Sequence, residues 1–309
     1  MLLHKSGYNP IVIDNLSTGS EESVKWGPFV KGNIGDKRIL AHVFQKYNPI
    51  AIIHFAAFSQ VIESMLNPYQ YFQNNVVETM NFIDTVIEME FNNIIFSSSC
   101  AVYGSPKIIP ISENIECKPI NPYGETKLII EKVLKWYGDL SHLKWISLRY
   151  FNVAGTSTAH NIGENIDKTT RLIPRAIKAA LGYSPKLEVY GNEFDTEDGT
   201  AIRDYVNVLD IANAHILALD SMLNKNIVNQ CFNIGNAIGF SVMEILNHIS
   251  TLTGKSVPYE ILKQKKGEPG VLLASNIKFN NTYNWKTNYS LEETISSTID
   301  WVKYWYQKK

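Results

Sequence analysis

The sequence has 309 residues, 45% of them hydrophobic and 19% charged, and its 29 Lys and Arg residues nearly balance its 30 Asp and Glu residues. This composition is that of a globular protein and excludes disordered, collagen-like and coiled-coil chains. The balanced charge also argues against nucleic-acid binding, which requires clustered basic residues, and the length predicts about two domains.

The start of the chain lacks the opening motif of a dinucleotide-binding sheet. Such a sheet normally begins with a strand, a Gly-rich turn and a helix whose N-terminus holds the pyrophosphate. Here residues 1–9 resemble the end of a helix, and no two glycines are two positions apart, so G-x-G-x-x-G does not occur. We therefore expect the strand and its turn upstream of Met1, in a protein whose start codon is misassigned.

The first predicted strand ends in an acidic residue, Asp14. An acid at this place suits the ribose hydroxyls of an adenine nucleotide, and an ordinary strand-end turn residue is the alternative. Short apolar runs then alternate with amphipathic stretches, a pattern typical of an α/β fold with a doubly wound parallel sheet. We expect strands at residues 11–14, 51–58, 93–97 and 145–151, and helices at 79–90 and 123–140.

The second half of the chain is richer in Thr, Asn and Gly and predicts a smaller, less regular lobe. We place the boundary between residues 153 and 154, with residues from about 205 to 235 also contributing to the first domain. The two lobes are expected to pack together and to leave a cleft at the carboxyl ends of the strands. Helices are expected at residues 172–181, 210–222, 242–253 and 291–306.

The cysteines and the apolar runs indicate the compartment. Cys100, Cys117 and Cys231 are widely spaced and have no His partners at zinc-binding intervals, so we expect neither a disulfide framework nor a metal site. We find no apolar run of about 18 residues and no signal-peptide pattern at the N-terminus. These features predict a cytoplasmic protein.

Three residues form a candidate catalytic group. Ser99 follows a buried-strand pattern, and Tyr123 and Lys127 are four positions apart on the same face of a predicted helix that begins at Asn121 and Pro122. A phenol titrates near pH 10 and is a poor base at neutral pH unless a nearby cation stabilises the phenolate, as Lys127 would. The spacing Y-x-x-x-K also occurs by chance on exposed helices, and the Ser-ended strand favours the catalytic interpretation.

Seven stretches carry a resemblance that extends over nearly the whole chain. They are residues 14–16 (DNL), 54–57 (HFAA), 74–76 (NNV), 96–104 (FSSSCAVYG), 122–127 (PYGETK), 149–152 (RYFN) and 196–206 (TEDGTAIRDYV). With these stretches the sequence resembles the extended short-chain dehydrogenase/reductase family and, within it, the group of UDP-glucose 4-epimerases.

The resemblance implies a Rossmann-like NAD-binding domain, a UDP-sugar-binding lobe and an isomerase of galactose metabolism. NAD would oxidise the sugar transiently at C4, and UDP-galactose and UDP-glucose would be interconverted. Tyr123 would act as the base for the C4 hydroxyl, Lys127 would lower the pKa of Tyr123 and hold the nicotinamide ribose, and Ser99 would orient the hydroxyl.

The resemblance also implies the binding residues. The cofactor would contact Asp14, Asn15, Leu16, Ser17, Thr18, Asn33, Ile34, Phe55, Ala56, Ala57, Ser59, Asn74, Ser99, Tyr123, Lys127 and Phe151. The UDP-sugar would contact Asn152, Leu172, Tyr190, Arg203, Lys265 and Glu268. Arg203 suits the pyrophosphate because a guanidinium group binds phosphate through two parallel hydrogen bonds, and the alternative is a structural pair with Asp204 or Asp198.

Several positions differ from the family. Asn33 stands where an acid usually faces the adenine, Lys265 stands where an Arg binds phosphate, and Arg171 replaces a smaller polar residue. Cys100 and Ala101 follow Ser99 where nucleotide-sugar dehydratases have an Asp–Glu pair, so dehydration is disfavoured. Besides an epimerase and a dehydratase, the sequence could also be a non-catalytic remnant of the family. Apolar positions on the helices at 79–90 and 123–140 suit either the core or a homodimer interface.

Overall fold

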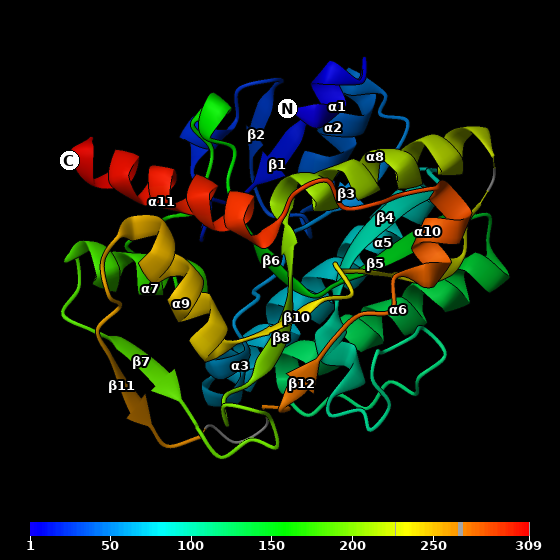
Figure 1. Ribbon diagram of the computed structural model, residues 1–309. Helices are drawn as coiled ribbons and strands as arrows, with labels where there is room; N and C mark the ends of the chain where they lie inside the picture. Colours follow the sequence, from blue (N-terminus) through cyan, green and yellow to red (C-terminus); the bar gives the residue numbers. More distant parts are fainter. Residues whose placement is uncertain (226, 265–267, 309) are drawn as a thin grey trace. The chain divides into compact units, whose positions relative to one another are not determined.

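The computed structural model describes residues 1–225, 227–264 and 268–308 (Figure 1). They form two compact units, each of which is made of three separate segments of the chain. The boundary predicted after residue 153 divides the chain by function, into a cofactor-binding and a substrate-binding part, and this division stays a prediction. The first unit comprises Met1–Gly104, Glu116–Arg149 and Asn213–Phe232, and the second comprises Ser105–Ile115, Tyr150–Ala212 and Asn233–Lys309.

The first unit contains two sheets. In one, β1 and β2 are parallel, and in the other the order is β3-β4-β5-β9, with β3 parallel to β4 and Ile53 paired with Ile95. The run of Ile94, Ile95 and Phe96 is buried, as expected for a strand that is covered on both faces. The strands are β1 (Val12–Asp14), β2 (Phe29–Lys31), β3 (Ile52–His54), β4 (Asn93–Ser99), β5 (Lys144–Tyr150) and β9 (Gln230–Ile234). The ends of β5 and β9 already belong to the second unit.

The helices of the first unit pack on these strands through one apolar core. Phe82 and Val86 of α5, Ile130 and Leu134 of α6, and Phe96 of β4 belong to this core. A five-residue π-helical segment, η2, joins α4 to α5 without a break. The helices are α1 (Leu2–Lys5), η1 (Glu21–Ser23), α2 (Lys37–Tyr47), α3 (Val61–Leu66), α4 (Pro68–Phe72), η2 (Gln73–Val77), α5 (Glu78–Glu88), η3 (Cys100–Tyr103) and α6 (Pro122–Leu140).

The second unit has its own sheets and core. Strand β8 pairs with β6, β10 and β12, while β7 and β11 form a parallel pair. Helices α7, α9 and α11 pack together around Ile177, Ile245 and Ile295. The elements are β6 (Asn152–Ala154), η4 (Thr158–His160), α7 (Leu172–Leu181), β7 (Leu187–Tyr190), β8 (Ile202–Asn207), β10 (Gly239–Ser241), α9 (Val242–Thr253), β11 (Tyr259–Leu262), β12 (Val271–Leu272), α10 (Ile277–Tyr283) and α11 (Leu291–Gln307), and α8 (Val208–Asn224) begins here and ends in the first unit.

The predicted α/β class is confirmed, and most predicted elements lie where they were expected. The helices predicted at residues 172–181 and 242–253 have these bounds in the structure. The strand predicted at 51–58 is shorter, because only Ile52–His54 pair with β4. Strand β4 is longer than predicted and continues to Ser99, which places this residue directly at a strand end.

Candidate active site

The first turn of α6 carries Tyr123, and two residues fix where this helix begins. Asn121 is the N-cap, and its Oδ1 accepts a hydrogen bond from the backbone N–H of Gly124 at 2.8 Å. Pro122 occupies the first helical position, where its missing N–H costs nothing. The capping motif therefore sets the position of Tyr123 along the helix.

Ser99 lies beside this turn. It ends β4 and caps η3, where its Oγ accepts a hydrogen bond from the backbone N–H of Ala101 at 3.2 Å. A Cβ atom on Gly124 would lie 2.4 Å from the carbonyl oxygen of Ala101, so only glycine allows α6 to approach η3 this closely. The segment after Ser99 and the helical turn that carries Tyr123 are therefore in direct contact.

Lys127 lies one turn further along α6 and is almost completely buried. Its Nζ donates a hydrogen bond to the carbonyl oxygen of Ser97 at 2.7 Å, and it lies 5.9 Å from the centroid of the Tyr123 ring. Burial lowers the pKa of Lys127 to about 7, while the Glu131 carboxylate acts in the opposite direction. A cation at this place stabilises a phenolate at Tyr123 and lowers the cost of removing its proton.

His54, at the end of β3, is a buried neighbour of this group that sequence reasoning did not single out. Burial, followed by the charge of Lys127, lowers the pKa of His54 to about 3. Its Nε2 lies 3.4 Å from the Thr79 hydroxyl, and its Nδ1 has no hydrogen-bond partner among the described residues. His54 is therefore neutral at pH 7 and adds no second positive charge beside Lys127.

Asn75, in the π-helical segment η2, connects a predicted cofactor-binding segment to α6. Its side chain accepts a hydrogen bond from the backbone N–H of Phe58 at 2.8 Å and donates to the Phe58 carbonyl oxygen at 3.0 Å. It also donates to the Thr126 hydroxyl at 3.1 Å, which in turn donates to the Tyr123 carbonyl oxygen. The matching stretch 74–76 contained Asn75, but only Asn74 was assigned to the cofactor, because the spacing of residues does not reveal a π turn.

The loop after β1 fits the adenosine ribose of a dinucleotide. The Asp14 carboxylate accepts the backbone N–H of Leu16 at 2.6 Å, and a Cβ atom on Gly19 would lie 3.3 Å from the other carboxylate oxygen. Leu16 has a left-handed backbone with φ 61°, which turns the chain around this carboxylate. An acid held at a strand end in this way has the chemistry that ribose hydroxyls require.

Asn33, which is predicted to contact the adenine, forms a hydrogen bond with another residue of the protein. Asn33 accepts a hydrogen bond from Asn15 at 2.7 Å, and Asn15 also accepts one from the backbone N–H of Ser17 at 2.9 Å. The Asn that stands in place of the usual acid therefore contacts the ribose-side loop. All the predicted contacts with the adenosine part of the cofactor stay predictions, including Thr18 after β1 and Ile34 after β2.

Other predicted cofactor contacts belong to different parts of the fold. Phe55 follows β3, is 58% exposed, and its ring lies 4.9 Å from that of His215 on α8. Ala56, Ala57 and Ser59 follow it along the same loop. Phe151 is buried in the second unit, where its backbone N–H bonds to the carbonyl of Ile234 at 3.1 Å.

The residues predicted to bind the UDP-sugar belong to the second unit. Tyr190 on β7 donates a hydrogen bond to the Glu188 carboxylate at 2.7 Å, and this bond is the first cause of a raised pKa at Tyr190. Asn152 begins β6, Leu172 begins α7, and Glu268 lies before β12. Lys265 lies outside the described residues.

Arg203 on β8 has partners other than the two acids considered for it. Its Nη1 donates to the carbonyl oxygens of Ile202 and Gly270, at 2.9 and 3.1 Å. The carboxylate of Asp204 accepts three backbone N–H groups of the second unit, and that of Asp198 accepts bonds from Thr200. The structural pairing of Arg203 with either acid is therefore not observed.

Other features of the described residues bear on the predicted classes. Cys100, Cys117 and Cys231 form no disulfide bonds with one another. Within residues 1–225, 227–264 and 268–308, we find no group of three or more His, Cys, Asp and Glu side chains placed to hold a metal ion. None of the described helices combines the length and the apolar character needed to cross a membrane.

Comparison with known proteins identifies close relatives. The family model described as the NAD dependent epimerase/dehydratase family matches residues 1–235. A UDP-glucose 4-epimerase of Rhizobium leguminosarum bv. trifolii is 40% identical over 299 residues, which is 97% of this chain and 91% of the relative.

Solved structures give the same result. The UDP-glucose 4-epimerase of Brucella ovis in complex with NAD is 44% identical, with a TM-score of 0.91 over 95% of this chain and 90% of that protein. The enzyme of Bifidobacterium longum in complex with NAD+ and UDP is 30% identical, with a TM-score of 0.92 over 98% of this chain and 93% of that protein.

Proposed function

The chain belongs to the NAD dependent epimerase/dehydratase family, and from this membership we propose how its residues carry out its reaction. Its function is that of a UDP-glucose 4-epimerase, an isomerase that interconverts UDP-galactose and UDP-glucose, and its cofactor is NAD. When bound, NAD supplies a hydride acceptor at C4 of the sugar that also returns the hydride. The chain must therefore move the proton of the C4 hydroxyl and hold both molecules.

The proposed base is Tyr123, and the observation that supports it is the Lys127 ammonium beside its ring. We propose that the phenolate of Tyr123 removes the proton of the C4 hydroxyl and later returns it. Lys127 stabilises the phenolate, and its hydrogen bond to the Ser97 carbonyl holds it in place. The Ser99 hydroxyl orients the reacting hydroxyl.

The proposed cofactor contacts follow the two ends of NAD. Asp14 and the loop around it would hold the adenosine ribose, and Lys127 would hold the nicotinamide ribose. Asn75 supports this arrangement because it fixes the backbone of Phe58 relative to α6. The rest of the proposed set is Asn15, Leu16, Ser17, Thr18, Asn33, Ile34, Phe55, Ala56, Ala57, Ser59, Asn74, Ser99, Tyr123 and Phe151.

The proposed substrate contacts are Asn152, Leu172, Tyr190, Arg203, Lys265 and Glu268. Arg203 is proposed to bind the pyrophosphate, because its two hydrogen bonds to carbonyl oxygens use Nη1 and leave the charge of the guanidinium without an acidic partner among Asp198 and Asp204. Dehydration is not favoured, because Cys100 and Ala101 after Ser99 cannot protonate and expel a hydroxyl as an acidic pair would.

We also propose a homodimer in the cytoplasm. Large apolar side chains are exposed on α5 and α6 at Met80, Trp136 and Leu140. Exposed apolar side chains on these two helices are suited to contact with a second copy of the same chain, which would bury them in a self-complementary interface.

The substitution Tyr123→Phe tests the proposed base. It removes one oxygen and leaves the ring that packs beside Lys127, so we expect turnover of UDP-galactose to fall at least ~100-fold, the usual contribution of a general base. NAD should remain bound after purification, as measured by its release on denaturation. Retention of normal turnover by this variant would show that another group is the base.

A further inference from the structure

A buried carboxylate follows the catalytic pair along α6. Tyr123, Lys127 and Glu131 recur every four residues and therefore lie along one face of the helix, about 6 Å apart along its axis at each step. The Glu131 carboxylate attracts Lys127 and raises its pKa against the effect of burial. Glu131 is 4% exposed and has no role in the reaction proposed above.

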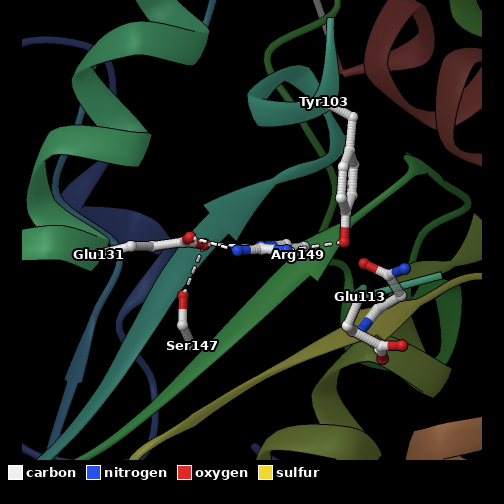
Figure 2. Close-up of polar contacts among 6 residues, drawn as sticks. Tyr103, Glu113, Glu131, Ser147 and Arg149 are labelled. Atoms are coloured by element: carbon white, nitrogen blue, oxygen red, sulfur yellow. Dashed lines mark hydrogen bonds and ion pairs between the residues drawn. The ribbon is translucent and has the colours of Figure 1, made fainter. Parts of the chain in front are cut away.

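Glu131 is fixed by a network of hydrogen bonds from β5 (Figure 2). Its Oε1 accepts bonds from Ser147 at 3.1 Å and from Arg149 Nε at 2.9 Å, and its Oε2 accepts a bond from Arg149 Nη2 at 2.6 Å. Arg149 Nη1 donates to the Tyr103 hydroxyl at 2.7 Å, on the segment that follows Ser99. Both charges of the pair are therefore held in one geometry.

Stability alone is a weak reason for such a pair. The side chains of Arg149 and Glu131 are 7% and 4% exposed, and a buried ion pair loses so much hydration that apolar residues of the same size often serve equally well. Burial opposes the charge of Arg149, yet its hydrogen bond and attraction to Glu131 raise its pKa, so the guanidinium remains charged. A buried ion pair thus lies on the same helix face as the two side chains proposed to be catalytic.

We propose that Glu131 and Arg149 are positioning residues for the reaction, which hold α6 against β5 and set the electrostatic potential at Tyr123 and Lys127. The inference rests on the proposed roles of these two residues. Because Arg149 also bonds to Tyr103, the same pair connects the catalytic helix to the segment after Ser99. The negative charge of Glu131 favours the ammonium form of Lys127, and the positive charge of Arg149 limits its effect on the phenolate of Tyr123.

Other groups also face the catalytic pair and its charged neighbours. Lys127 faces His54 on β3 and the ring of Phe96 on β4, and Tyr123 interacts with Tyr71 on α4, whose hydroxyl donates to Glu63 on α3. The thiols of Cys117 and Cys231 interact with Arg149, and Lys132 acts on Cys117. None of these side chains is substituted in the variants below, and the charges of Arg149 and Glu131 act on the thiol of Cys117 as well.

The test measures the ionisation of Tyr123 in the full chain from the absorbance of tyrosinate. The absorbance of the same protein with Tyr123→Phe is subtracted at each pH, so that only the signal of Tyr123 remains. Glu131→Gln removes the negative charge and should lower the pKa of Tyr123 by roughly one pH unit, the size expected for charges about 12 Å apart at an effective dielectric constant of about 20. Arg149→Met removes the opposite charge and should raise it. The double variant should return toward the wild-type value.

Two controls separate charge from packing. Ser147→Ala removes a hydrogen bond to the Glu131 carboxylate without changing its charge, so the measured pKa of Tyr123 should stay at the wild-type value. Glu131→Asp also keeps the negative charge and should leave the pKa of Tyr123 unchanged. A folded Glu131→Gln or Arg149→Met protein in which Tyr123 titrates as in the wild type would overturn the inference. The titration needs no turnover, so wild-type protein that fails to epimerise UDP-galactose would contradict the proposed function separately.

Discussion

Lys127 and His54 are buried neighbours in the first unit, and burial lowers the pKa of both. The consequence differs between them, because His54 becomes neutral at pH 7 whereas Lys127 keeps a share of its charge beside Tyr123. A desolvated ammonium group destabilises the folded protein relative to an apolar residue. The arrangement is therefore consistent with a residue retained for chemistry, at a cost in stability.

The pKa of His54 predicts how stability depends on pH. Its value is about 3 in the folded protein and 6.5 in the unfolded chain, so only the unfolded chain binds this proton between these values. The free energy of unfolding should therefore fall as the pH is lowered below about 6.5, by up to ~1.4 kcal/mol per pH unit from this group.

Denaturant unfolding at a series of pH values measures this effect. In His54→Gln, the free energy of unfolding should depend less on pH between about pH 6.5 and about pH 4. In His42→Gln, which alters an exposed residue of α2, the pH dependence should be that of the wild type. An unchanged slope in His54→Gln would mean that His54 is accessible to protons in the folded protein.

At the scale of the element, the first turn of α6 positions Tyr123, the proposed base. Gly124→Ala would place a Cβ atom 2.4 Å from a backbone oxygen of η3, so the helix must shift away from Ser99. We expect a loss of about 1–3 kcal/mol in stability, measured by thermal unfolding, together with reduced turnover. The matched control is Lys135→Ala on the exposed face of α6, which should change stability by less than about 0.5 kcal/mol. A Gly124→Ala protein as stable and active as the wild type would show that this contact is not required.

The elements that sequence predicted best are those defined by local signals. Helix α9 begins at Ser241 with a capping box and ends at Gly254 in the left-handed conformation, and both signals are visible in the sequence. Helix α2 (Lys37–Tyr47) and the π turn at η2 were not predicted. A π turn contains one more residue than an α-helical turn, and no local sequence pattern specifies it.

Side-chain partners were the least predictable part of the candidate site. The spacing of Tyr123 and Lys127 predicted that they share a helix face, and the structure places them so. The pairing of Glu131 with Arg149 depends on how α6 packs against β5, which residues 18 positions apart in the sequence do not reveal. The acids Asp204 and Asp198 were the alternative partners of Arg203, but its Nη1 donates to backbone carbonyl oxygens, which the order of residues in the sequence does not reveal either.

At the scale of the whole molecule, the exposed apolar side chains of α6 predict self-association. Trp136 is 65% exposed and Leu140 is 80% exposed, and a charge at Trp136 would have to be buried in any interface formed there. We expect the wild type to sediment as a dimer and Trp136→Lys as a monomer. Tyr259→Lys, which alters an exposed aromatic residue on β11, should leave the dimer intact. A wild-type monomer, or a dimer unaffected by Trp136→Lys, would contradict this interface.

The most direct measurement of the reaction itself follows the hydrogen at C4. UDP-galactose labelled with deuterium at C4 is converted by the purified protein, and the product is examined by nuclear magnetic resonance. If the hydride leaves C4 and returns to it without exchange, UDP-glucose will form with deuterium retained at C4. Loss of the label to water, or its transfer to C6 with loss of the C6 hydroxyl, would contradict 4-epimerisation and indicate a different reaction at the same site.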